Sequence, residues 1–109
     1  MTTRQLVALT YREARRMRLS EWKIDVMFKP VDEMVRSGHD DDGLTFIDAE
    51  YQQVVIWVSK AIRHEHDRVR ETVVHELLHV RLEGHRPQGR YDPAYELGLN
   101  VIAGLLARE

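Results

Sequence analysis

The strongest helical pattern in the chain is RVRETVVHELLHVRLEG, Arg68–Gly84, and the other predicted elements are arranged around it. Its apolar residues recur at intervals of three and four, which predicts a helix with two buried stripes. The stripes are Val69, Val73, Leu77 and Val80, and Val74, Leu78 and Leu82. Arg70 and Arg81 fall between the stripes and are predicted to face solvent. Asp67 is the predicted N-cap of this helix, and Gly84 marks its predicted end.

The same stretch contains His75-Glu76-Leu77-Leu78-His79, an H-E-x-x-H motif. On a helix, residues four apart lie about 40° apart around the axis and about 6 Å apart along it, so both imidazoles can bind one ion. Glu76 lies about 100° further round. There it is adjacent to the ion without being a ligand, and it can act as general base toward a metal-activated water. The alternative interpretation is a pair of hydrogen-bonded core histidines, each of which would need a partner.

A catalytic zinc site needs a third protein ligand and an open position, and the sequence offers two candidate ligands. His85 follows Gly84 directly, at a point where the chain can turn back toward the metal. Glu96 lies on a predicted last helix, which opens with Asp92 as N-cap and Pro93 at its first position.

That last helix is predicted to extend through Ala107, and Glu96 shares one of its faces with Asn100, Ala103 and Ala107. The alanines would allow a close approach to the neighbouring helix. Asn100 could accept a hydrogen bond from the distal nitrogen of a ligating histidine. These residues favour Glu96 over His85 as the third ligand, and both candidates remain open.

The remaining segments predict a small sheet with helices packed on it. An amphipathic helix is predicted over Thr3–Leu19. Alternating or β-branched residues predict three strands, Trp22–Val31, Leu44–Asp48 and Gln53–Ser59, and Ser37–Gly43 has the composition of a turn. An N-terminal helix, a three-stranded sheet, the motif-bearing helix and a C-terminal helix together predict a single α+β domain.

Composition restricts the classes of function that remain. The chain has 109 residues, of which 43% are hydrophobic and 31% charged, as in one globular domain. A net charge of -2 provides no general attraction to nucleic acid or to an anionic membrane. The absence of cysteine excludes disulfide scaffolds, thiol enzymes and cysteine-ligated metal sites. The longest apolar run, Val54–Val58, is too short to span a membrane, and no apolar leader follows Met1–Arg4, so we expect a cytoplasmic protein.

The segment TVVHELLH, Thr72–His79, followed by Glu96 and one turn later by Asn100, resembles the zincin metallopeptidases. It is most similar to the gluzincin branch, in which the third ligand is a glutamate on a following helix. The short chain and the order of its elements look like the minimal gluzincins, or minigluzincins. The resemblance extends over about Gln53–Ala107.

This resemblance implies a metallopeptidase with a single zinc ion per chain, bound by His75, His79 and Glu96. It implies that Glu76 is the general base and returns the proton to the leaving amine. It also implies that the strand near Val54–Ser59 is the sheet edge that aligns a substrate by β-augmentation. Because a cleft on so small a domain is shallow, we expect the substrate to be an extended peptide or an unfolded protein.

One further residue and two other functions complete the predictions. Tyr91 is a candidate for stabilising an oxyanion. His75, His79 and His85 also match the H-x3-H-x5-H spacing of metzincins and of the rRNA-maturation endoribonucleases, so a three-histidine, metal-dependent endoribonuclease is an alternative. The net negative charge and the presence of Glu76 disfavour nucleic acid as the partner. A latent or non-catalytic zincin-like binding module is the other alternative.

Overall fold

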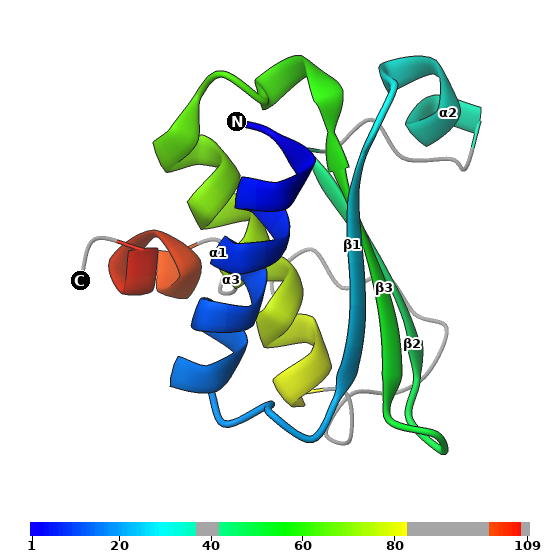
Figure 1. Ribbon diagram of the computed structural model, residues 1–109, viewed down its shortest axis with the longest axis vertical. Coiled ribbons are helices and arrows are strands. Elements are labelled where there is room, and N and C mark those ends of the chain that lie inside the picture. The colour runs from blue at the N-terminus through cyan, green and yellow to red at the C-terminus, as the bar shows by residue number, and fades with distance from the viewer. Residues whose placement is uncertain (37–41, 83–100, 108–109) are drawn as a thin grey trace.

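Three strands form one sheet in the computed structural model, which describes residues 1–36, 42–82 and 101–107 (Figure 1). The strands are β1 (Lys23–Lys29), β2 (Gly43–Asp48) and β3 (Gln53–Ser59), and they lie in the order β1-β3-β2. β3 pairs in parallel with β1 and antiparallel with β2. The predicted α+β class is confirmed.

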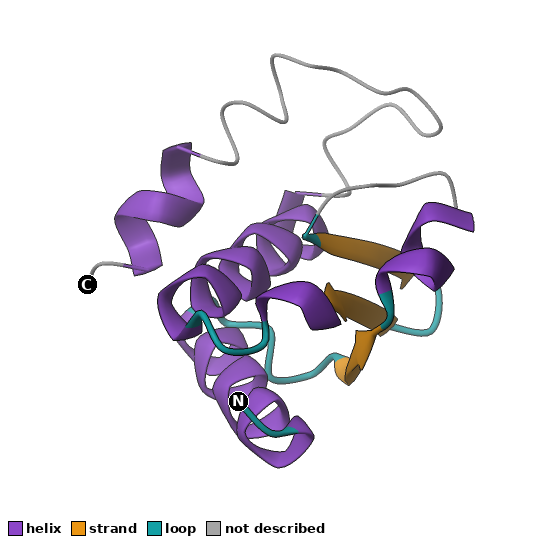
Figure 2. Ribbon diagram, turned by 90° about the horizontal axis from the view of Figure 1, so that it is seen from above, coloured by secondary structure: helices purple, strands orange, loops and turns teal. Residues whose placement is uncertain are grey.

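Two long helices cover one face of this sheet, and Figure 2 shows the layer of helices beside the layer of strands. α1 (Thr3–Arg16) packs on β1 and on α3, whereas α3 (His66–Leu82) packs on β2 and β3. A short helix, α2 (Val31–Arg36), follows β1, and a 3-10 turn, η1 (Lys60–Ile62), joins β3 to α3. Residues 101–107 are also helical. No helix in these described ranges is long and apolar enough to cross a membrane.

The main core lies between these helices and the inner face of the sheet. Its largest contributions come from α1, α3 and alternate residues of β1 and β3, namely Leu6, Leu9, Val69, Val73, Leu77, Val80, Ile24, Val26, Val54, Ile56 and Val58. The second stripe of α3, with Val74 and Leu78, forms a separate cluster with Ala103. Both predicted stripes of this helix are therefore buried.

The ends of α1 follow from local chemistry. Thr2 Oγ1 accepts a hydrogen bond from the Gln5 backbone N–H, and Gln5 Oε1 accepts one from the Thr2 N–H, which is a capping box. Arg18 then has a left-handed backbone with φ 59°, and the Leu19 N–H bonds to the Ala14 carbonyl at 2.9 Å. The helix therefore ends before the predicted Leu19, because the chain reverses at Arg18.

Several predicted boundaries near α2 and α3 differ from the structure. The strand predicted to reach Val31 ends at Lys29, because Pro30 introduces α2, whose Met34 is only 1% exposed. α3 begins at His66, so Asp67 lies in its first turn and is not the N-cap.

Of the two arginines predicted to face solvent, Arg81 is exposed, whereas Arg70 is half-buried because α1 covers part of that side of α3. The Arg70 side chain is 29% exposed, and its Nε lies 3.3 Å from Oε1 of Glu13 on α1. Helical periodicity places Arg70 between the two apolar stripes, and there its side chain contacts Glu13 of α1 while part of it stays exposed.

The expectation that Val54–Ser59 forms the edge of the sheet is also wrong, because β3 is the central strand. Its backbone is paired with β1 on one side and with β2 on the other. Of the two edge strands in the described part of the chain, β2 is the one that packs against α3.

Candidate metal centre

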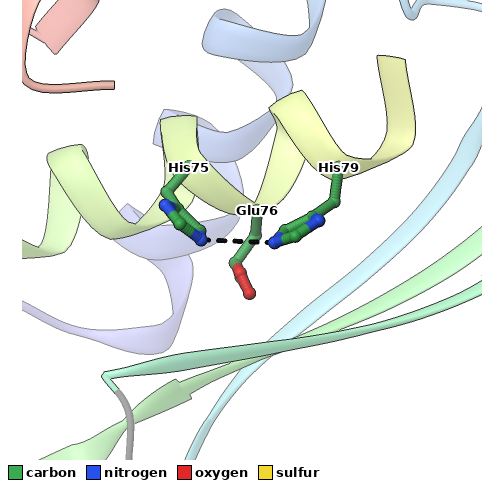
Figure 3. A group of neighbouring side chains, drawn as sticks. All are labelled: His75, Glu76 and His79. Carbon is green, nitrogen blue, oxygen red and sulfur yellow. Dashed lines mark hydrogen bonds between the residues drawn. The ribbon is translucent and has the colours of Figure 1, made fainter. Parts of the chain in front are cut away.

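His75 and His79 lie one turn apart on α3, and their rings point to the same side of the helix (Figure 3). Their Nε2 atoms are 3.2 Å apart, and the ring planes make an angle of 70° with centroids 5.0 Å apart. Two nitrogens bound to one tetrahedral zinc ion at 2.0–2.1 Å would lie about 3.3–3.4 Å apart. The separation of the two imidazoles therefore fits a shared zinc ion as well as a mutual N–H···N hydrogen bond.

Glu76 lies beside the two imidazoles, with its carboxylate directed toward the sheet (Figure 3). The residue is 4% exposed and His79 is 9% exposed, whereas His75 is half-buried. One ligand atom from each of the three side chains lies within 4.8 Å of the others, so the group could hold a metal ion. Imidazole nitrogens are donors that zinc accepts, so His75 and His79 fit as two of its ligands, and the Glu76 carboxylate lies close enough to act on a water beside the ion.

β2 forms the wall of the site on the sheet side. At Gly43, a Cβ atom would lie 3.1 Å from Glu76 Cγ and 2.7 Å from Thr72 Cγ2, so the strand backbone lies directly against α3. Thr45 points to the same face of the strand, two residues further along. Its Oγ1 is buried and has no hydrogen-bond partner among the described residues.

The start of β2 is fastened to the beginning of α3 and to β3. Arg68 Nε and Nη2 donate to the two carboxylate oxygens of Asp42 at 2.6 and 2.9 Å. This pairing raises the pKa of the Arg68 guanidinium, chiefly through the hydrogen bond and charge of Asp42. The Asp42 carbonyl also accepts a hydrogen bond from the Ser59 N–H at 2.7 Å. The residue directly before β2 is thus held to both α3 and β3, which fixes the position of the strand beside Glu76.

The helical residues 101–107 pack on another side of α3. Ala103 is fully buried in a cluster with Val74 and Leu78, as the predicted close approach of the last helix requires. By the helical period, His75 and His79 lie between this side of α3 and the side that carries Glu76 and faces β2. The two imidazoles therefore lie on the surface of α3 between its contacts with β2 and with the C-terminal helix.

The remaining predicted site residues are Glu96, His85, Tyr91 and Asn100, and all four lie outside the described residues. The identity of the third ligand and the role of Tyr91 stay predictions. The sequence did not indicate a role for Gly43, which was assigned to a turn, because the contact that gives it importance is made by residues about thirty positions further along.

Comparison with family models, with curated proteins and with solved structures found no match to this chain. The motif on α3 and the geometry around it therefore carry the functional argument.

Proposed function

We propose that this protein is a zinc-dependent metallopeptidase. The observation that carries the proposal is the pair of imidazole Nε2 atoms 3.2 Å apart on α3, with the buried Glu76 carboxylate beside them. The order H-E-x-x-H supplies this carboxylate at the position where zinc peptidases need a base.

In this proposal His75 and His79 hold the zinc ion together with Glu96. When bound, the ion supplies Lewis acidity, which polarises the peptide carbonyl and makes water easier to deprotonate. The Glu76 carboxylate accepts a proton from the water while the water oxygen forms a bond to the carbonyl carbon. Glu76 then delivers that proton to the amide nitrogen as the C–N bond breaks, which yields a carboxylic acid and an amine.

The placement of β2 supports an extended peptide as the substrate. Among the described residues, β2 is an edge strand of the sheet, and it packs against α3 beside Glu76. We therefore transfer the substrate-aligning role expected of residues 54–59 to residues 43–48. A peptide added to this edge would gain main-chain hydrogen bonds without requiring a particular side-chain sequence. An extended or unfolded chain can bind in this way, whereas a folded protein does not present such a strand.

The proposal is tested with Glu76→Gln, assayed on an unfolded protein and on internally quenched peptides. The variant is expected to retain zinc and to lose about 10²–10⁴-fold in hydrolysis, because an amide cannot accept the proton. His79→Ala is the matched variant that should lose both zinc and activity. Hydrolysis that survives in Glu76→Gln would contradict the proposal. Zinc-dependent cleavage of RNA without cleavage of peptides would favour the endoribonuclease, and zinc binding without either activity would favour a binding module.

A further inference from the structure

Gly43 is the first residue of β2 and lies where this strand meets the middle of α3. A Cβ atom at this position would lie 2.7 Å from Thr72 Cγ2, and 3.1 and 3.2 Å from Glu76 Cγ and Cδ. Carbon atoms in van der Waals contact are about 3.5–4.0 Å apart, so even a methyl group does not fit without movement of its neighbours. The backbone of Gly43 therefore packs directly against the Glu76 side chain.

A glycine is required here because there is no room for a side chain, and not because of the backbone conformation. Gly43 lies in a regular strand and does not have the left-handed φ that favours glycine over other residues. Gly104 provides the contrast within the same chain. A Cβ atom there would meet Glu71 Oε1 at 3.5 Å, which is an ordinary contact.

The backbone at Gly43 is also held on its N-terminal side. Asp42 is bound through both carboxylate oxygens to Arg68 of α3 and through its carbonyl to the Ser59 N–H of β3. Thr72 is restrained as well, because its Oγ1 donates to the Arg68 carbonyl at 2.8 Å. Of the side chains that meet at this point, Glu76 has the most rotatable bonds, three against the one of Thr72.

We propose that Gly43 is a positioning residue for Glu76. Its missing side chain lets the β2 backbone approach the Glu76 methylene and carboxyl carbons and fix the direction of the carboxylate beside His75 and His79. The inference rests on the proposed function insofar as Glu76 acts as the general base. A carboxylate displaced by about 1 Å from its working position is expected to lose up to about 100-fold in rate.

The test separates the two contacts of the added methyl group. Gly43→Ala alone combines a clash with Thr72 and a clash with Glu76, so it can lower stability for a reason unrelated to Glu76. In the double variant Gly43→Ala/Thr72→Ser the Cγ2 atom is gone, and of the three nearest atoms only the two of Glu76 remain. Thr72→Ser is its reference, and Gly104→Ala is the matched glycine control.

We expect the double variant to melt close to Thr72→Ser, to keep zinc affinity within about threefold and to keep its KM, while kcat falls about 10–100-fold. Its crystal structure is expected to show the Glu76 carboxylate displaced relative to the Thr72→Ser reference. Gly104→Ala should match the wild-type protein in zinc affinity, KM and kcat, and should melt at the same temperature or slightly above it, because alanine is favoured over glycine in a helix. If the double variant has both the kcat and the melting temperature of Thr72→Ser, the inference is overturned, because the glycine at position 43 would then be needed only for packing against Thr72.

The crystal structure also separates failure of this inference from failure of the proposed function. If the wild-type protein hydrolyses no peptide, the metallopeptidase proposal fails, and the position of the Glu76 carboxylate in the double variant still decides the role of Gly43. An unchanged Glu76 conformation in that structure would overturn the inference whatever the activity.

Discussion

α3 takes part in two interfaces that each bury a glutamate, and the surroundings of the two carboxylates differ. Glu13 on α1 is 2% exposed and accepts hydrogen bonds from Arg16 Nη1 at 2.7 Å and from Arg70 Nε at 3.3 Å. Glu76 is 4% exposed and lies beside two imidazoles and against the β2 backbone. Guanidinium groups form ion pairs with a carboxylate and hold it in a structural role. Imidazole nitrogens can instead bind a metal ion, and a carboxylate beside them can then act on the water near that ion. The neighbours of a buried acid, rather than its burial, therefore indicate its function.

The largest expected effect is a loss of zinc affinity on removal of a ligand of the proposed metal centre. Glu96→Ala should weaken zinc binding at neutral pH by several orders of magnitude, because a carboxylate ligand is lost. His85→Ala should weaken it about tenfold or less, as for a residue outside the ligand set. Glu13→Gln should not change the affinity, because Glu13 belongs to the other interface. Competition titration against a chromophoric chelator measures all three, and a larger effect for His85 than for Glu96 would assign the chain to the three-histidine class.

The next largest effect is a loss of folding stability on substitution of Glu13, the glutamate that is paired with arginines. Glu13→Gln is expected to lower the free energy of unfolding by about 1.5–3 kcal/mol, because charged hydrogen bonds to Arg16 and Arg70 are lost. Exposed Glu50 is the control, and Glu50→Gln should change stability by less than about 0.5 kcal/mol. Urea denaturation of the zinc-free proteins provides the values. Equal destabilisation by Glu13→Gln and Glu76→Gln would contradict the distinction between the two interfaces.

The smallest effect concerns two threonines, Thr45 on β2 and Thr10 on α1, whose buried hydroxyl groups differ in hydrogen bonding. Thr45 Oγ1 is buried without a partner among the described residues, whereas Thr10 Oγ1 donates to the Leu6 carbonyl at 2.8 Å. Thr45→Val should raise the free energy of unfolding by about 0.5–1 kcal/mol, because it removes an unsatisfied hydroxyl from a strand. Thr10→Val should lower it by a similar amount. The same urea series tests both, and a loss of stability in Thr45→Val would show that its hydroxyl has a partner.

Helical periodicity was a reliable guide to α3 because it depends on residues that are close in the sequence. It predicted the two buried stripes of α3, and the spacing of His75 and His79 predicted that their rings share a side of the helix. The predicted strand Gln53–Ser59 agrees with β3 in both bounds. These features follow from the fixed geometry of helices and strands.

The features that the sequence did not predict depend on contacts between distant segments. The alternation of apolar and polar residues along a strand does not determine which strands lie beside it. The central position of β3 and the edge position of β2 among the described strands were therefore not predicted. A helical wheel gives the angle of Arg70 without stating that α1 lies there. The importance of Gly43 likewise arises only when β2 is placed on α3.

The most direct test of the metal centre on α3 is elemental analysis of the purified protein together with its melting temperature before and after chelation. We predict about one zinc ion per chain, because the proposed site joins the histidine pair and a third ligand in one tetrahedral arrangement with an open position. Removal of the ion should lower the melting temperature, and added zinc should restore it, because a ligand at 1,000 times its Kd stabilises the folded state by about 4 kcal/mol. His79→Ala should show no such dependence. A protein without transition metal, which melts at the same temperature with and without added zinc, would contradict the assignment of His75 and His79 as ligands of a metal ion.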